Sequence, residues 1–142
     1  MKYWLAMLAV VALAPASQTI AASDRDAIEQ LLVDSYIEGL FANRDEAAVR
    51  RGFHPDFVLH ILDDGELVVA PLDRWLERLD LDGGKSESQW RHRATNIDIT
   101  GDAATARVEV FENDNHIYTD YFGFYRFDSG WLIVNKIFAG HE

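Results

Sequence analysis

Residues 89–139 have the sequence QWRHRATNIDITGDAATARVEVFENDNHIYTDYFGFYRFDSGWLIVNKIFA. Four runs in it are rich in β-branched and aromatic residues, at 89–99, 103–112, 116–127 and 131–139. Short segments of Gly, Asp, Asn, Ser and Thr separate these runs at 100–102, 113–115 and 128–130. Runs of this composition with turn residues between them predict four long antiparallel strands.

The residues before this sheet favour helices. Ser23 and the acidic residues after it predict a helix start, because a Ser oxygen can cap the first backbone N–H groups. Apolar and small residues then recur at spacings of three and four, which predicts one buried helix face: Ile28, Leu31, Leu32, Ser35, Tyr36, Gly39 and Leu40. A short second helix is expected over 46–51.

A hairpin and a third helix are expected before the sheet. Residues 57–62 predict a strand, Asp63-Asp64-Gly65 a tight turn, and 66–70 the returning strand. Pro71 suits the first turn of a helix, which Gly83-Gly84 end. Helices on one side of an antiparallel sheet make an α+β fold. Because a sheet of long strands twists and curls, we expect a hollow between sheet and helices that suits a small molecule.

The first 22 residues have the pattern of a secretory leader. Lys2 supplies a positive charge, and Tyr3 to Ala14 carry no charged side chain. This apolar run is shorter than the roughly 20 residues that span a bilayer. We therefore expect a signal peptide over 1–22, one domain over 23–142, and a periplasmic or secreted protein.

Composition excludes several classes of function. The 142 residues carry a formal net charge of −11, which disfavours nucleic acid and anionic membranes as partners. The chain has no cysteine, so disulfide scaffolds and thiol nucleophiles are excluded. Its five histidines have none of the spacings typical of metal sites, and no phosphate-binding loop is present. We expect no metal and no cofactor.

Four sequence strings resemble the putative lumazine-binding family of the nuclear-transport-factor-2-like superfamily. These strings are Phe53-His54-Pro55-Asp56, residues 97–104 (IDITGDAA), Thr119-Asp120-Tyr121-Phe122 and residues 130–138 (GWLIVNKIF). The resemblance implies a cone-shaped fold of three N-terminal helices packed on a curved, mainly antiparallel sheet. It also implies a pocket between sheet and helices, and a homodimer built on the outer face of the sheet. Enzymes of this superfamily use pocket Asp, His and Tyr side chains, usually without a metal.

Asp120 is the first candidate for a catalytic residue. Alternation along a strand should place Tyr118, Asp120, Phe122 and Phe124 on one face. A carboxylate among apolar side chains is suited to act as a general base near neutral pH. The alternative is a structural Asp paired with a buried cation. His60, in an otherwise apolar strand, is the second catalytic candidate, or a core histidine bonded to a backbone carbonyl.

Five residues are candidates for ligand binding. Tyr36, on the buried helix face, can point its hydroxyl into the cavity or simply pack. Lys136 can bind a substrate carboxylate, pair with Asp120 or reach a dimer rim. Tyr118 shares the face of Asp120, and Trp90 shares a strand face with His92. Their neighbours Arg91 and Arg93 point the other way, either to bind an anion or to balance nearby acids.

These residues leave three functions open. The first is an exported protein that binds a small, partly aromatic organic molecule. The second is a cofactor-free dehydratase or isomerase in which Asp120 takes a proton and His60 or Tyr36 stabilises the oxyanion. The third is a dimeric interaction module whose cavity is filled by its own side chains.

Overall fold

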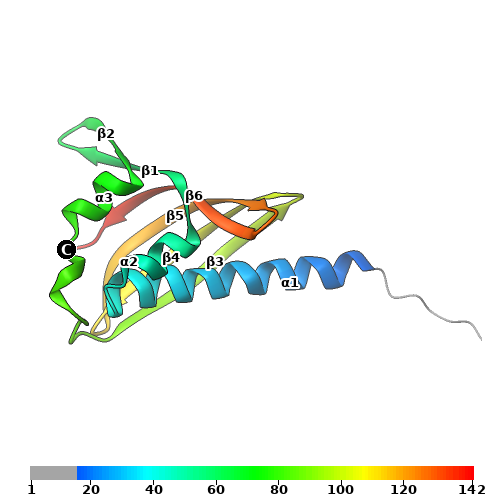
Figure 1. Ribbon diagram of the computed structural model, residues 1–142, viewed down its shortest axis with the longest axis horizontal. Coiled ribbons are helices and arrows are strands. Elements are labelled where there is room, and N and C mark those ends of the chain that lie inside the picture. The colour runs from blue at the N-terminus through cyan, green and yellow to red at the C-terminus, as the bar shows by residue number, and fades with distance from the viewer. Residues whose placement is uncertain (1–15) are drawn as a thin grey trace, which may run out of the picture.

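The computed structural model describes the backbone of residues 16–142 and the side chains of residues 23–142. Most of the predicted leader, residues 1–15, lies outside the described residues. The elements shown in Figure 1 follow one another as α1 (Ala16–Leu31), the π-helix η1 (Leu32–Ala42), α2 (Glu46–Gly52), β1 (Phe53–Asp63), β2 (Glu66–Pro71), α3 (Leu72–Arg78), the 3₁₀ turn η2 (Leu81–Gly83), β3 (Trp90–Thr100), β4 (Ala103–Glu112), β5 (Asn115–Phe127) and β6 (Gly130–Gly140).

The six strands form one mixed, mostly antiparallel sheet. Their order is β2-β1-β6-β5-β4-β3. The pair β1–β6 is parallel, and the other four pairs are antiparallel. The last four strands lie within one residue of their predicted bounds, whereas β1 begins at Phe53, four residues earlier than expected. The predicted α+β fold is confirmed.

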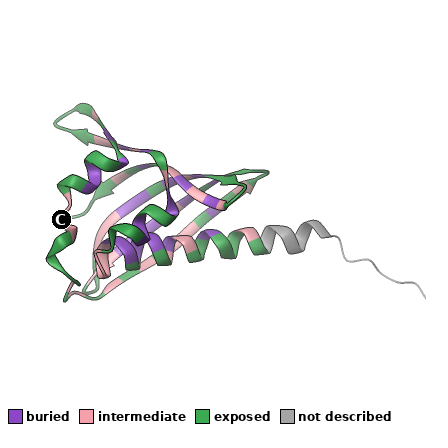
Figure 2. Cartoon of the chain, viewed as in Figure 1, coloured by how far each residue is buried: buried purple, intermediate pink, exposed green. Residues whose placement is uncertain are grey.

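The helices lie on one face of this sheet. The long N-terminal helix runs beneath β3 to β6, and α3 covers the end of the sheet near the β1–β2 hairpin (Figure 1). Buried residues concentrate where helices and strands face each other (Figure 2). On β5, Asp120, Phe122 and Phe124 are buried while Tyr121 and Tyr125 are exposed, so the predicted alternation is confirmed.

The first helix differs from the prediction in its start and in its hydrogen bonding. Among the described residues it begins at Ala16, so the expected start at Ser23 is wrong. The side chain of Asp24 instead accepts hydrogen bonds from Arg126 and from Trp131 Nε1, the latter at 3.0 Å. After Leu31 the helix widens into η1, in which the backbone N–H of Asn43 donates to the carbonyl of Glu38, five residues earlier. Such π-helices are rare and often occur at functional sites.

Irregular pairing bends the sheet. The register shifts between Thr95 and Asp98 of β3 and between Gly123 and Phe124 of β5. Extra residues of this kind increase local twist and bend a strand.

Within the described residues, no helix is both long enough and apolar enough to span a bilayer.

Candidate functional site

A cavity of about 440 Å³ lies between the sheet and the helices. Its walls come from η1, β1, α3, the segment around η2, and strands β3, β5 and β6. The lining side chains are mainly apolar and aromatic: Leu40, Phe41, Arg44, Leu59, Ile61, Trp75, Leu79, Asp80, Leu81, Trp90, Tyr118, Lys136 and Phe138. A cavity of this size and character is typical of sites for small organic molecules.

Lys136 brings a charge to the wall of this cavity. The side chain is buried, and its Nζ lies 3.1 Å from Oδ1 of Asp120 and 2.9 Å from the hydroxyl of Tyr36. The Tyr36 hydroxyl in turn donates to Oδ2 of Asp120 at 2.7 Å. Three polar side chains from η1, β5 and β6 therefore form a closed triangle of hydrogen bonds.

The geometry of the strands explains this triangle. Phe122 lies opposite Lys136 in the β5–β6 pair, and Asp120 lies opposite Phe138. Asp120 and Lys136 are thus diagonal neighbours on the inner face, within reach of each other. Tyr36 comes from the helical layer above them, where η1 buries its ring completely.

Lys136 is the member of the triangle that reaches the cavity. Asp120 and Tyr36 are fully buried and do not line it. An ammonium group has three N–H donors, and Asp120 and Tyr36 occupy two of them. Among the described residues, no third acceptor bonds this nitrogen. One donor therefore remains for an oxygen atom of a ligand.

Aromatic rings surround the same nitrogen. The Nζ of Lys136 lies within about 6 Å of four ring centroids: Tyr36 at 5.0 Å, Trp75 at 5.3 Å, Phe122 at 5.8 Å and Phe138 at 4.9 Å. Aromatic faces attract a cation through their quadrupoles. These rings offset part of the cost of removing the ammonium from water.

Burial shifts the acid–base properties of two members of the triangle. Burial lowers the pKa of Lys136, and the neighbouring carboxylate of Asp120 opposes this shift. Burial also raises the pKa of Tyr36 well above its ordinary value, with a further contribution from Asp120. The phenol therefore stays protonated, while the amine is easier to deprotonate than an exposed lysine.

The structure gathers five of the seven predicted site residues. Trp90, Tyr118 and Lys136 line the cavity, and Asp120 and Tyr36 lie directly behind Lys136. The possible pairing of Lys136 with Asp120 is confirmed. Asp120 does not line the cavity, and both its oxygens are hydrogen-bonded inside the protein, so it is not placed to contact a ligand directly.

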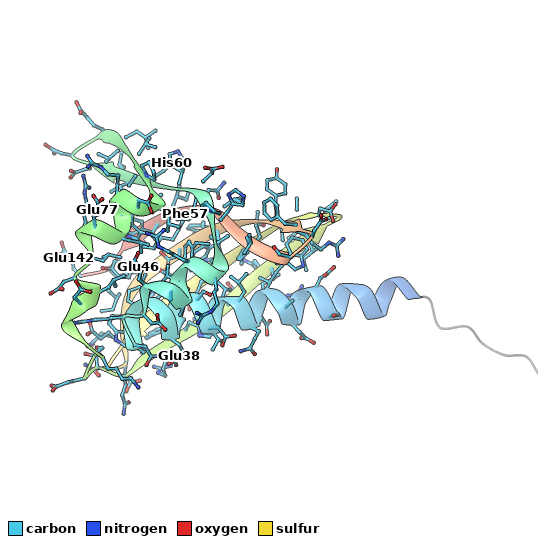
Figure 3. The ribbon with its side chains drawn as sticks, viewed as in Figure 1. Glu38, Glu46, Phe57, His60, Glu77 and Glu142 are labelled. Atoms are coloured by element: carbon cyan, nitrogen blue, oxygen red, sulfur yellow. The ribbon has the colours of Figure 1, made fainter. Side chains whose placement is uncertain are left out.

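The two candidate histidines, His60 and His92, lie outside the inner cavity. His60, on β1 beside the β1–β2 hairpin (Figure 3), lines a hollow on the outer face of the sheet. It is therefore on the opposite side of the sheet from Asp120, and the expected partnership of His60 with Asp120 in one pocket is wrong. His92 does not line the cavity; it is half-buried near Glu29 of α1, and burial lowers its pKa.

Arg91 and Arg93 balance acids on the outer face. Arg91 donates to Asp114 at 2.5 Å, and Arg93 bonds Glu109. The outer hollow, which these two arginines do not line, is larger, about 810 Å³, and its lining includes exposed Tyr121, Tyr125 and Ile137. We place the site in the inner cavity. Of the inner cavity and the outer hollow, only the inner cavity combines aromatic side chains with the buried ammonium of Lys136.

The sequence predictions missed several wall residues. Phe41 stacks on Trp90 with ring centroids 4.5 Å apart, and Phe138 packs edge-on against Tyr118 at 5.7 Å. Phe138 follows Lys136 by two residues, so alternation along β6 was enough to find it. Phe41, Trp75 and Arg44 come from helices and loops, whose position over the sheet no local pattern gives.

Among the described residues, no group of three or more His, Asp or Glu side chains is placed to hold a metal ion. The polar chemistry of the cavity is that of one amine backed by a carboxylate and a phenol.

Comparisons with known proteins agree with this architecture. Residues 23–139 match the family described as putative lumazine-binding. A protein of Cladobotryum sp named aldolase FrzH is 30% identical over 111 residues, which cover 75% of this chain and 83% of that protein. A nuclear-transport-factor-2-like protein of unknown function from Shewanella baltica has a TM-score of 0.73 and 25% identity, over 85% of this chain and 96% of its own.

A second such protein of unknown function, from Methylobacillus flagellatus, has a TM-score of 0.67 and 28% identity, over 84% of this chain and 94% of its own. The sequence match covers nearly all of the described side chains, and the structural matches share the sheet and its helical layer. The chain belongs to the putative lumazine-binding family of nuclear-transport-factor-2-like proteins.

Proposed function

We propose that this protein, exported to the periplasm or beyond after removal of residues 1–22, binds a small organic molecule in the inner cavity. The ligand has an aromatic or other flat apolar body and an oxygen that accepts a hydrogen bond. The observation that carries this proposal is the free donor of Lys136 at the wall of an aromatic cavity of about 440 Å³. The leader sequence supports export.

The aromatic wall sets the shape of the ligand. Phe41 and Trp90 form one stacked pair, and Tyr118 and Phe138 form an edge-on pair. Aromatic side chains bury large area and prefer stacked or edge-on partners, so they favour an aromatic ligand. Arg44 and Asp80 also line the cavity, so its wall carries one further cationic and one anionic side chain.

Methyl 2-naphthoate is a suitable probe because it has an aromatic body and an ester carbonyl. We expect calorimetric titration to give one site per chain for this ester. The hydrocarbon 2-ethylnaphthalene, which lacks the oxygen, should bind about 10- to 100-fold more weakly, since a hydrogen bond to a charged donor contributes about 1.5–3 kcal/mol. Equal affinity for the two probes would show that Lys136 donates no hydrogen bond. Absence of binding by both would reject the pocket function.

A second candidate function is cofactor-free chemistry on a carbonyl compound. It is supported by the Lys136–Asp120–Tyr36 triangle and by the similarity to a protein named aldolase. In this reaction class Lys136 would donate to a carbonyl oxygen and so stabilise the negative charge that develops there. His60, on the outer face, takes no part.

Retro-aldol cleavage of 4-hydroxy-4-(2-naphthyl)butan-2-one tests this candidate. The reaction breaks one carbon–carbon bond and releases 2-naphthaldehyde and acetone, and the aldehyde is followed by fluorescence. We expect release above the protein-free rate, and its loss when both Lys136→Met and Asp120→Asn are present. A rate unchanged by the double substitution would place the chemistry outside this cavity.

We also propose that the protein is a homodimer formed through the outer face of its sheet. Tyr121, Tyr125 and Ile137 are each about half exposed there, and Tyr121 lies opposite Ile137 in the β5–β6 pair. Exposed apolar residues grouped in this way are typical of interfaces. The family resemblance supports the same face.

Light scattering at micromolar concentration should give the mass of a dimer. Ile137→Glu should shift the mass to that of a monomer, because it buries a charge in the interface. Leu67→Glu, on the exposed β1–β2 hairpin, is the control and should remain dimeric. A monomer mass for the unsubstituted protein would contradict the proposal.

A further inference from the structure

Three features meet at the Nζ of Lys136. The Lys136 side chain lines the cavity, a carboxylate oxygen of Asp120 lies 3.1 Å from its Nζ, and four aromatic rings surround that nitrogen. A simple hydrogen-bond donor would need only the first feature. The second provides a base that can take a proton from the ammonium, and the third keeps water away from the nitrogen.

We propose that Lys136 is a covalent site that forms an imine with an aromatic aldehyde or ketone bound in the inner cavity. This inference rests on the proposed function, because the carbonyl compound must first occupy that cavity. It adds two assignments to the proposed function: the chemical class of the ligand, and the Nζ of Lys136 as the protein atom that bonds to it.

The proton balance of this step uses groups already in contact. Asp120 takes one proton from the Lys136 ammonium, which leaves a neutral amine beside a carboxylic acid. The amine attacks the carbonyl carbon, so a carbon–nitrogen bond forms and the carbon–oxygen π bond breaks. A proton moves from nitrogen to the oxygen to give a carbinolamine. Asp120 then returns its proton to the Lys136 nitrogen, which it contacts, and that nitrogen passes a proton to the hydroxyl group. The hydroxyl group leaves as water, and the protonated imine remains.

The overall reaction conserves charge at the site. An ammonium and a carbonyl become a protonated imine and one water, with no oxidant, reductant or metal. The product carries the same positive charge beside the same Asp120 carboxylate and among the same four ring faces. Because the surroundings that stabilise the reactant cation also stabilise the product cation, imine formation needs no rearrangement of the buried charges.

Burial makes the Lys136 amine easier to deprotonate than an exposed lysine. An exposed lysine with the ordinary pKa of about 10.4 is neutral in on the order of one molecule in a thousand at pH 7. Burial lowers the pKa of Lys136, so a larger fraction of this amine is nucleophilic. Tyr36 stays protonated and holds the nitrogen in place through its hydroxyl.

The chain provides its own reference amine. Its lysines are Lys2, Lys85 and Lys136, and Lys85 lies exposed between η2 and β3. The full-length protein is incubated at pH 7 with 2-naphthaldehyde and sodium cyanoborohydride, which reduces an imine to a stable amine. Peptide mapping by mass spectrometry then gives the fraction of each lysine that carries the naphthylmethyl group.

We expect Lys136 to be labelled at least about tenfold faster than Lys85, because binding in the cavity holds the aldehyde beside the Lys136 amine. Excess methyl 2-naphthoate, which cannot form an imine, should protect Lys136 and leave the labelling of Lys85 unchanged. Labelling of Lys136 that is absent, no faster than that of Lys85, or unaffected by the ester would overturn the inference.

The titration with the ester separates this inference from the proposed function. If the ester binds and Lys136 is not labelled, the cavity binds ligands without covalent chemistry and the imine is rejected alone. If neither the ester binds nor Lys136 is labelled, both the pocket function and the imine are rejected.

Discussion

Lys136→Met is expected to lower the free energy of unfolding by about 3–5 kcal/mol. The substitution keeps the length of the side chain but leaves the Asp120 carboxylate buried without its cation. It also leaves the Tyr36 hydroxyl without one of its donors. Removing one partner of a buried ion pair costs far more than the pair itself contributes, because the remaining charge is neither solvated nor neutralised.

The double variant Lys136→Met with Asp120→Asn should regain at least half of this loss. An Asn amide is neutral and can still accept a hydrogen bond from Tyr36, so no buried charge remains. Lys85→Met, which removes an exposed amine, is the matched control and should change the free energy by less than about 0.5 kcal/mol. Urea denaturation measures all three variants. A loss below about 1 kcal/mol for Lys136→Met would contradict the buried ion pair.

Ile61→Trp should abolish ligand binding while the protein remains folded. Ile61 lines the cavity from β1 and is partly buried, so an indole there projects into the space that a ligand would occupy. We expect the affinity for methyl 2-naphthoate to fall by at least about 30-fold, equal to about 2 kcal/mol. The extra ring fills an existing cavity, so it avoids most of the strain that an added ring causes in a packed core.

Leu62→Trp is the matched control for this variant. Leu62 is the next residue on the same strand, points to the other side and is 77% exposed. Calorimetric titration should show unchanged affinity for the control. If Ile61→Trp binds the ester as well as the unsubstituted protein, the ligand occupies another part of the surface.

The predictions from sequence succeeded where a residue pattern has one structural meaning. On β5 the inward residues Asp120, Phe122 and Phe124 alternate with exposed tyrosines, so the buried face was unambiguous. On β1 both faces are apolar. Alternation therefore groups His60 with Val58 and Leu62 but does not say which face meets the helices, and His60 lies on the outer one.

Other parts of the site depend on tertiary structure. Where the first helix widens into η1, a backbone N–H donates to the carbonyl five residues earlier instead of four. The buried residues recur at spacings of three and four, and that pattern does not reveal this change. The distance between Asp120 and Lys136 depends on the β5–β6 register, which places Lys136 opposite Phe122 and Phe138 opposite Asp120. Arg44 and Trp75 join the wall because α3 and the loops pack over the sheet, which the local sequence does not specify.

A crystal structure of the protein with methyl 2-naphthoate tests the central claim most directly. The naphthalene ring should lie in the inner cavity against Phe41, Trp90 and Tyr118, with the ester carbonyl within hydrogen-bond distance, about 2.7–3.2 Å, of Lys136 Nζ. The Lys136–Asp120 contact should remain. A ligand bound in the outer hollow beside His60, or one seated in the inner cavity with its oxygen directed away from Lys136, would contradict the account.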